Sequence, residues 1–123
     1  VSSTSIHTVF ARRLKAARLQ AGLSQGALGI AAGIDESVAA VRINRYEQAV
    51  HFSDFATATN IARALNIPAA YFYCEGDDLA LLVLEFHRAD PIHRKAVMES
   101  FSNLSSTFNI DKQSGKLKFL LAN

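Results

Sequence analysis

The fold is decided by residues 18–48, which read RLQAGLSQGALGIAAGIDESVAAVRINRYEQ. Ser24 can cap a short helix over residues 25–32, because its hydroxyl can accept a backbone N–H of the first turn. A glycine then ends this helix, and Asp35 is a candidate cap for a longer one that runs to about Gln48. The stretch therefore predicts two helices joined by a glycine-containing turn.

Helical spacing continues on both sides of this stretch. A helix is expected to begin near Thr8, another after a cap at Ser53, and a short one over residues 68–73. The residues expected in the core stripes are Phe10, Leu14, Ala17, Ala21, Ala39, Ile43, Tyr46, Phe55, Ala58, Thr59, Ala62 and Leu65. We therefore expect an all-α protein with a five-helix domain over residues 1–74, ordered from residue 7.

A glycine and three acidic residues at positions 75–78 interrupt the apolar periodicity and mark a domain boundary. Beyond it we expect a helix over residues 79–89 and another that starts at Asp90-Pro91 and ends before Asp111. Residues 116–121 alternate in polarity, which permits either a short strand or a tail. Residues 75–123 thus form a short helical C-terminal extension with a tail.

Composition fits a globular chain, since half of the 123 residues are hydrophobic and 20% are charged. Residues 1–74 hold seven lysines and arginines against four acids, a net charge of +3, whereas residues 75–123 hold six against seven, a net charge of −1. The first part suits a polyanionic partner, although a charge of this size is also ordinary for a solvated surface.

The sequence favours a cytoplasmic location. Cys74 is the single cysteine and cannot form an intrachain disulfide, and no charged and then apolar leader opens the sequence. The longest purely apolar run, residues 79–84, is far shorter than the roughly 20 residues that a membrane span needs. We therefore expect no membrane insertion.

Four ordered blocks carry a specific resemblance. They are RLQAGLSQ at residues 18–25, AAGI at 31–34, RINRYE at 42–47 and IARALNI at 61–67. Together with the flanking helices, over roughly residues 8–74, they resemble the Cro and phage-repressor family, also called the XRE family. The resemblance implies a phage-repressor-like helix-turn-helix domain, and hence a transcriptional regulator that binds double-stranded DNA.

The resemblance also implies roles for particular side chains. Gln25 would open the second helix and touch both the phosphate backbone and the recognition helix, which would enter the major groove. There an arginine can bond guanine, an asparagine can bond adenine, a serine can add a small hydrogen bond and a valine can contact a thymine methyl. The candidate DNA-binding residues are Gln25, Ser37, Val41, Arg42, Asn44 and Arg45.

The chain departs from the family between Ile34 and Glu47, where it is longer by about four residues, or one helical turn. Either the recognition helix starts a turn early, or the preceding turn has become a longer loop. The assignment of Ser37 and Val41 depends on which alternative holds. The loop after this helix also lacks the family's usual glycine and proline.

Other charged residues have structural interpretations. Arg18 and Glu47 match a family pair that joins the first helix to the end of the recognition helix, so we expect a partly buried ion pair. Arg12, Arg13 and Lys15 are expected on a solvated helix face, from which one of them can approach the DNA backbone. His51 is expected to be an ordinary loop histidine rather than a phosphate contact.

No set of residues suggests catalysis, which needs a nucleophile, a base and an orienting group placed together. His87, Asp90 and His93 match no metal-ligand spacing, and Cys74 beside three aromatic residues is expected to be a buried hydrophobe. We therefore expect no enzyme activity, no catalytic residue, no metal and no cofactor.

The extension carries apolar stripes that a five-helix domain does not need for its own core. We expect them to join two chains into a homodimer on a palindromic operator, although packing against their own domain is the simpler alternative. The dimer candidates are Leu79, Leu82, Val83, Phe86, Val97, Phe101, Leu104 and Phe108. An alternative function is a protein-interaction module, such as an antitoxin or a coactivator bridge, with weak DNA binding.

Overall fold

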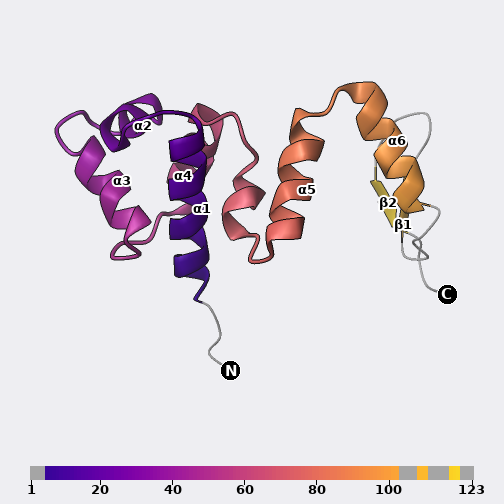
Figure 1. Cartoon of the computed structure of the whole chain (residues 1–123), viewed down its shortest axis with the longest axis horizontal. Coiled ribbons are helices and arrows are strands. Elements are labelled where there is room, and N and C mark those ends of the chain that lie inside the picture. The colour runs from indigo at the N-terminus through magenta and orange to yellow at the C-terminus, as the bar shows by residue number, and fades with distance from the viewer. Residues whose placement is uncertain (1–4, 103–107, 111–116, 120–123) are drawn as a thin grey trace. The chain divides into compact units, whose positions relative to one another are not determined.

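The computed structural model describes residues 5–102, 108–110 and 117–119, and helices dominate that part of the chain (Figure 1). The predicted helical domain and helical extension are confirmed, and the fifth short helix is a 3₁₀ helix. The elements in chain order are α1 (Ile6–Gln20), α2 (Gln25–Ala31), α3 (Ala39–Glu47), α4 (Phe55–Ala64), η1 (Ala69–Tyr73), α5 (Asp77–Arg88), α6 (Pro91–Ser102), β1 (Phe108–Ile110) and β2 (Leu117–Phe119).

Residue contacts divide the chain into two compact units, residues 1–87 and 88–123. In the first unit α1 contacts α3 and η1, and α2 packs against α3 (Figure 1). Ala80 and Leu84 of α5 are buried in the same core as the preceding helices. The domain boundary that was predicted between residues 74 and 75 therefore lies before α5, although α5 packs with the first unit. The largest fully buried side chains are Val9, Leu14, Leu28, Ile43, Ile61 and Phe72.

The first helix begins slightly earlier than expected. Ser5 lies in extended conformation, and its hydroxyl accepts the backbone N–H of His7, so α1 starts at Ile6. At the other end Gly22 has a φ of +71°, and its N–H bonds the carbonyl oxygen of Leu19. This left-handed conformation, which glycine adopts without a steric penalty, ends the helix as predicted.

The predicted cap and first core residue of α4 are wrong. Asp54, not Ser53, caps the helix, because its carboxylate accepts the N–H of Thr57 at 2.7 Å. Phe55 is the first residue of α4 and is 79% exposed. The buried side of the helix is formed instead by Ala58, Ile61 and Ala62, with Leu65 partly buried against the same core.

Arg13 is buried rather than solvated, contrary to the expectation for the charged face of α1. Its Nε donates to the carbonyl oxygen of Cys74 at 2.9 Å and its Nη2 to that of Glu75 at 3.0 Å. Nη2 also lies 2.9 Å from a carboxylate oxygen of Asp77. The guanidinium thus joins α1 to the segment between η1 and α5, and Arg12 adds longer contacts with Glu75 and Asp77.

The second unit contains the end of the predicted extension. Asp90 accepts the N–H of His93 at 2.8 Å at the start of α6, as expected for a cap. The predicted continuation of this helix to Phe108 is wrong, because α6 ends at Ser102 and Phe108 lies in β1. β1 and β2 pair antiparallel, so the strand alternative holds over residues 117–119. Leu104 lies outside the described residues.

Candidate nucleic-acid interface

The extra residues before α3 form a turn, so the longer-loop alternative holds. Asp35 caps this turn and not a helix, because its carboxylate accepts the backbone N–H of Ser37 at 2.9 Å and also bonds the Ser37 hydroxyl. These bonds, from the side chain first and then from the backbone, lower the pKa of Asp35. α3 begins at Ala39 with Val38 as its N-cap residue, so the predicted placement of Ser37 on the helix is wrong.

α2 and α3 approach closely at a glycine that the sequence analysis did not single out. A Cβ built on Gly29 would lie 2.8 Å from the Cβ of Ala39 and 2.9 Å from its carbonyl oxygen. Gly26, one turn earlier, would place a Cβ 3.7 Å from that of Ala40, which is an ordinary contact. Gly26 and Gly29 are three residues apart and so lie on one face of α2, and this spacing is the feature of the sequence that could have predicted the close approach to α3.

Arg18 and Glu47 form the predicted ion pair. Arg18 Nε and Nη2 donate to the two carboxylate oxygens of Glu47 at 2.6 and 2.9 Å, and Nη1 donates to the carbonyl oxygen of Leu23. The hydrogen bonds to Glu47 raise the pKa of Arg18 above its usual value, against the opposing effect of burial. This two-pronged contact fixes the end of α3 against α1.

Gln25 connects the start of α2 to α3. Its Nε2 donates to Oδ1 of Asn44 at 3.1 Å and lies 3.4 Å from Oε1 of Glu47. The Asn44 amide oxygen has a second lone pair, and both N–H groups of that amide remain available as donors. Asn44 is therefore held in place while it keeps the acceptor and donors that pairing with adenine requires.

The outer side of α3 is exposed along its length. Ile43 and Tyr46 are buried beneath it, whereas Val41, Asn44 and Arg45 face solvent. Residues three and four apart on a helix share a face, so these exposed side chains form one surface. Among the described residues no acceptor binds the Arg45 guanidinium.

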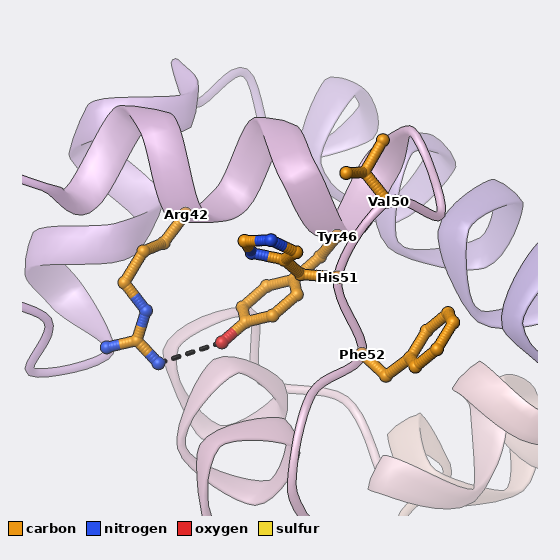
Figure 2. A pocket seen from close by; sticks show the side chains of 5 residues that line it. All are labelled: Arg42, Tyr46, Val50, His51 and Phe52. Carbon is orange, nitrogen blue, oxygen red and sulfur yellow. Dashed lines mark hydrogen bonds between the residues drawn. The ribbon is translucent and has the colours of Figure 1, made fainter.

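Arg42 lies on the flank of this surface. Its Nη2 donates to the hydroxyl of Tyr46 at 2.8 Å, one turn further along α3 (Figure 2). The chain then leaves α3 through Ala49, whose φ is +56°, and the N–H of Val50 bonds the carbonyl oxygen of Arg45. Alanine thus adopts the left-handed conformation that usually favours glycine, which explains how the helix ends without one.

Of the six candidate DNA-binding residues, five lie on α2 and α3. Gln25 and Asn44 are in direct contact, and Val41, Asn44 and Arg45 share the exposed face. Ser37 lies apart from the helix in the preceding turn. The DNA-binding role of each of the six residues stays a prediction.

The described residues include no group of three or more histidine, cysteine, aspartate or glutamate side chains that could hold a metal ion. Asp90 and His93 contact each other at the cap of α6, with Nδ1 and a carboxylate oxygen 2.8 Å apart. Cys74 is buried, and its thiol donates to the carbonyl oxygen of Ala70. None of the helices in the described part of the chain combines the length and apolarity of a membrane span.

Comparison with known proteins places the exposed helix in a familiar motif. A family model described as a helix-turn-helix domain matches residues 9–71. The crystal structure of transcriptional regulator BswR is similar, with 39% sequence identity and a TM-score of 0.71 over 76% of this chain and 92% of that one. A search of curated proteins found no match.

Proposed function

The chain belongs to the helix-turn-helix domain family, and on this premise we propose that it is a sequence-specific transcriptional regulator that binds a palindromic DNA operator as a homodimer. Regulators with this motif place their second helix in the major groove and often bind as two-fold dimers. We keep the cytoplasmic location that the sequence favours as a part of this proposal, since it is compatible with DNA binding.

The observation that carries this proposal is the contact between Gln25 and Asn44 next to an exposed Arg45. A long cation and a positioned amide at neighbouring positions can bond guanine and adenine edges, respectively, in the major groove. Val41 lies on the same face, where its methyl groups can contact thymine. The backbone N–H groups that begin α2 near Gln25 suit a DNA phosphate.

Rigid attachment of α3 also supports this role. Sequence recognition requires side chains that are held in register, because a small displacement of the helix would misplace each base contact. The ion pair of Arg18 with Glu47 anchors one end of α3, and the close approach of Gly29 to Ala39 anchors the other. α3 is thus held at both ends while its outer face stays open.

Exposed leucines on α5 support the homodimer. Leu79 and Leu82 are exposed on one side of the helix, whereas Ala80 and Leu84 point into the core of their own unit. A second copy of the chain could cover the exposed side, and the two recognition helices would then read half-sites about 34 Å apart. Val97 and Phe101 of α6, in the second unit, remain further candidates for contacts between two chains.

Selection of bound sequences from a random pool of duplex DNA tests the proposal. We expect an enriched motif with two-fold symmetry, whose binding weakens steeply with salt because phosphate contacts release counterions. Enrichment of an unsymmetrical motif would contradict the palindrome and the dimer but not DNA recognition. Failure to enrich any sequence at low ionic strength would instead favour the protein-interaction module.

A further inference from the structure

An open cavity lies beside α3, between this helix and the loop that follows it. It is lined by Arg42, Tyr46, Val50, His51 and Phe52, which Figure 2 shows from close by. Its volume is about 490 Å³. Small-molecule sites commonly have volumes of roughly 300–1,000 Å³, so this cavity is large enough for one or two fused rings.

The lining combines one cation with apolar and aromatic walls. Val50 and Phe52 are 62% and 59% exposed, so much of their apolar surface is open to a ligand. Tyr46 and His51 contribute further rings, and the Arg42 guanidinium lies 5.9 Å from the centre of the Tyr46 ring. Only one of the five guanidinium N–H groups is needed for the Tyr46 hydroxyl, which leaves donors for a ligand.

The walls are held in place before any ligand binds. The Phe52 ring stacks on that of His7 in α1, with ring centres 3.5 Å apart and planes inclined by 19°. The backbone N–H groups of Val50 and His51 bond the carbonyl oxygen of Arg45. A site whose walls are already ordered loses less conformational entropy on binding.

We propose that this cavity binds a small planar aromatic anion, such as an aryl carboxylate, with its charge on Arg42 and its rings against Tyr46, His51 and Phe52. A guanidinium matches the geometry of a carboxylate with two parallel hydrogen bonds. The aromatic rings favour a flat apolar ligand, because offset or edge contacts between rings add to the burial of apolar surface.

The negative charge of Asp54 near Arg42 is expected to weaken the binding of an anion, so a substitution of Asp54 offers a further test. Its carboxylate caps α4, and Arg42 is close enough to contribute to the lowering of the Asp54 pKa, after the larger effect of the hydrogen bonds from Thr57. Asp54→Asn keeps an acceptor for the Thr57 N–H but removes the negative charge. This variant is therefore expected to bind an anion more tightly.

Occupation of the cavity would affect DNA binding, a consequence that rests on the proposed function. Arg42 is one of the proposed DNA contacts, and a ligand that holds its guanidinium withdraws it from the duplex. Ligand and DNA would then compete for the same side chain. The ligand would act as an effector that releases the protein from its operator.

The test uses 2-naphthoate as the probe and neutral 2-naphthamide as its matched control, with binding measured by calorimetry on the full chain without DNA. We expect saturable binding of the naphthoate that weakens about tenfold or more in Arg42→Met, since a hydrogen bond to a charged group is lost. Phe52→Ala should weaken it as well. Phe55→Ala removes an exposed aromatic ring that does not line the cavity and should change nothing.

Three outcomes would overturn the site. These are no saturable binding below ~10 mM, equal binding of the amide, or binding that Arg42→Met or Phe52→Ala leaves unchanged. Weaker binding by Asp54→Asn than by the wild type would overturn the assignment of the charge to Arg42.

Competition is measured separately on the selected operator. Naphthoate at ten times its dissociation constant should raise the apparent dissociation constant for DNA about tenfold. Unchanged DNA affinity would overturn the effector role. A protein that binds naphthoate but no DNA would overturn the proposed function while the site stands.

Discussion

Gly29 faces Ala39 so closely that a Cβ on the glycine would lie 2.8 Å from the alanine Cβ. Glycine at this position sets how near α2 can approach α3. The orientation of α3, and not only its sequence, therefore depends on a buried residue.

Replacement of this glycine should destabilise the domain. Gly29→Ala forces α2 and α3 apart and is expected to cost about 1–3 kcal/mol, as overpacked cores do. Gly26→Ala is the matched control, because its Cβ would meet only an ordinary contact and should stabilise α2 by roughly 0.5–1 kcal/mol. Urea unfolding of both variants measures the difference. Equal stability of the two would contradict the close approach.

Loss of Arg18 alone should lower the free energy of unfolding more than loss of both Arg18 and Glu47. Arg18→Met leaves the buried Glu47 carboxylate without its cation, which typically costs about 3–5 kcal/mol. The double variant with Glu47→Leu removes the stranded charge and should recover part of that stability. A double-mutant cycle by chemical denaturation measures the coupling. Purely additive losses would show that the two side chains do not interact in solution.

Asp54 should contribute to the acid sensitivity of the fold. Hydrogen bonds from the Thr57 side chain and backbone lower the pKa of Asp54 in the folded state. Its ionised form therefore stabilises the fold above the unfolded-state pKa of about 3.9, and this contribution is lost as the pH falls through the lower folded-state pKa. Asp54→Asn does not titrate, so it should lose less stability between about pH 6 and pH 3. Identical losses in wild type and variant, measured by urea unfolding, would contradict this account.

The proposed dimer predicts different effects for two exposed leucines of α5. Leu82→Glu should convert the dimer to a monomer, because it places a charge in an apolar interface. Leu81 is 59% exposed, against 45% for Leu82, but lies on another side of the helix, so Leu81→Glu should leave the dimer intact. Sedimentation velocity distinguishes the two. A wild-type monomer at all concentrations would exclude the interface.

The order of the helices could be predicted from the sequence because their ends depend on local chemistry. Ser24 accepts the N–H of Ala27, and Gly22 and Gly33 adopt positive φ values at the ends of α1 and α2, as glycines in helix stops do. The pair of Arg18 with Glu47 also followed from sequence, through the family resemblance. The helix ends depend only on neighbouring residues, and the ion pair was inferred from a motif that resembles a known family.

The errors arose in two ways, because segments outside the helix decide the structure at two positions and close neighbours compete for one side chain at a third. Arg13 belongs to the charged part of α1 in any helical projection. It is nevertheless buried, because its guanidinium donates hydrogen bonds to carbonyl oxygens that lie more than sixty residues away in the sequence. Asp35 is a good helix cap by composition, but the Ser37 N–H satisfies its carboxylate first. The apolar residues after Ser102 continue a helical spacing in the sequence. Phe108 lies instead in a short strand that pairs with a second strand. The contacts of Arg13 and the strand pairing of Phe108 cannot be read from the helical pattern alone.

The most direct test of the central claim is the DNA affinity of Arg45→Ala beside that of Arg63→Ala, an exposed arginine of α4 outside the proposed interface. On the selected operator we expect Arg45→Ala to weaken binding by about 1–3 kcal/mol, roughly five- to 150-fold, and to relax the preference at one base pair. Arg63→Ala should leave both affinity and preference close to those of the wild type. Equal effects of the two substitutions, or an unaltered base preference in Arg45→Ala, would contradict the proposal that α3 reads the operator through this side chain.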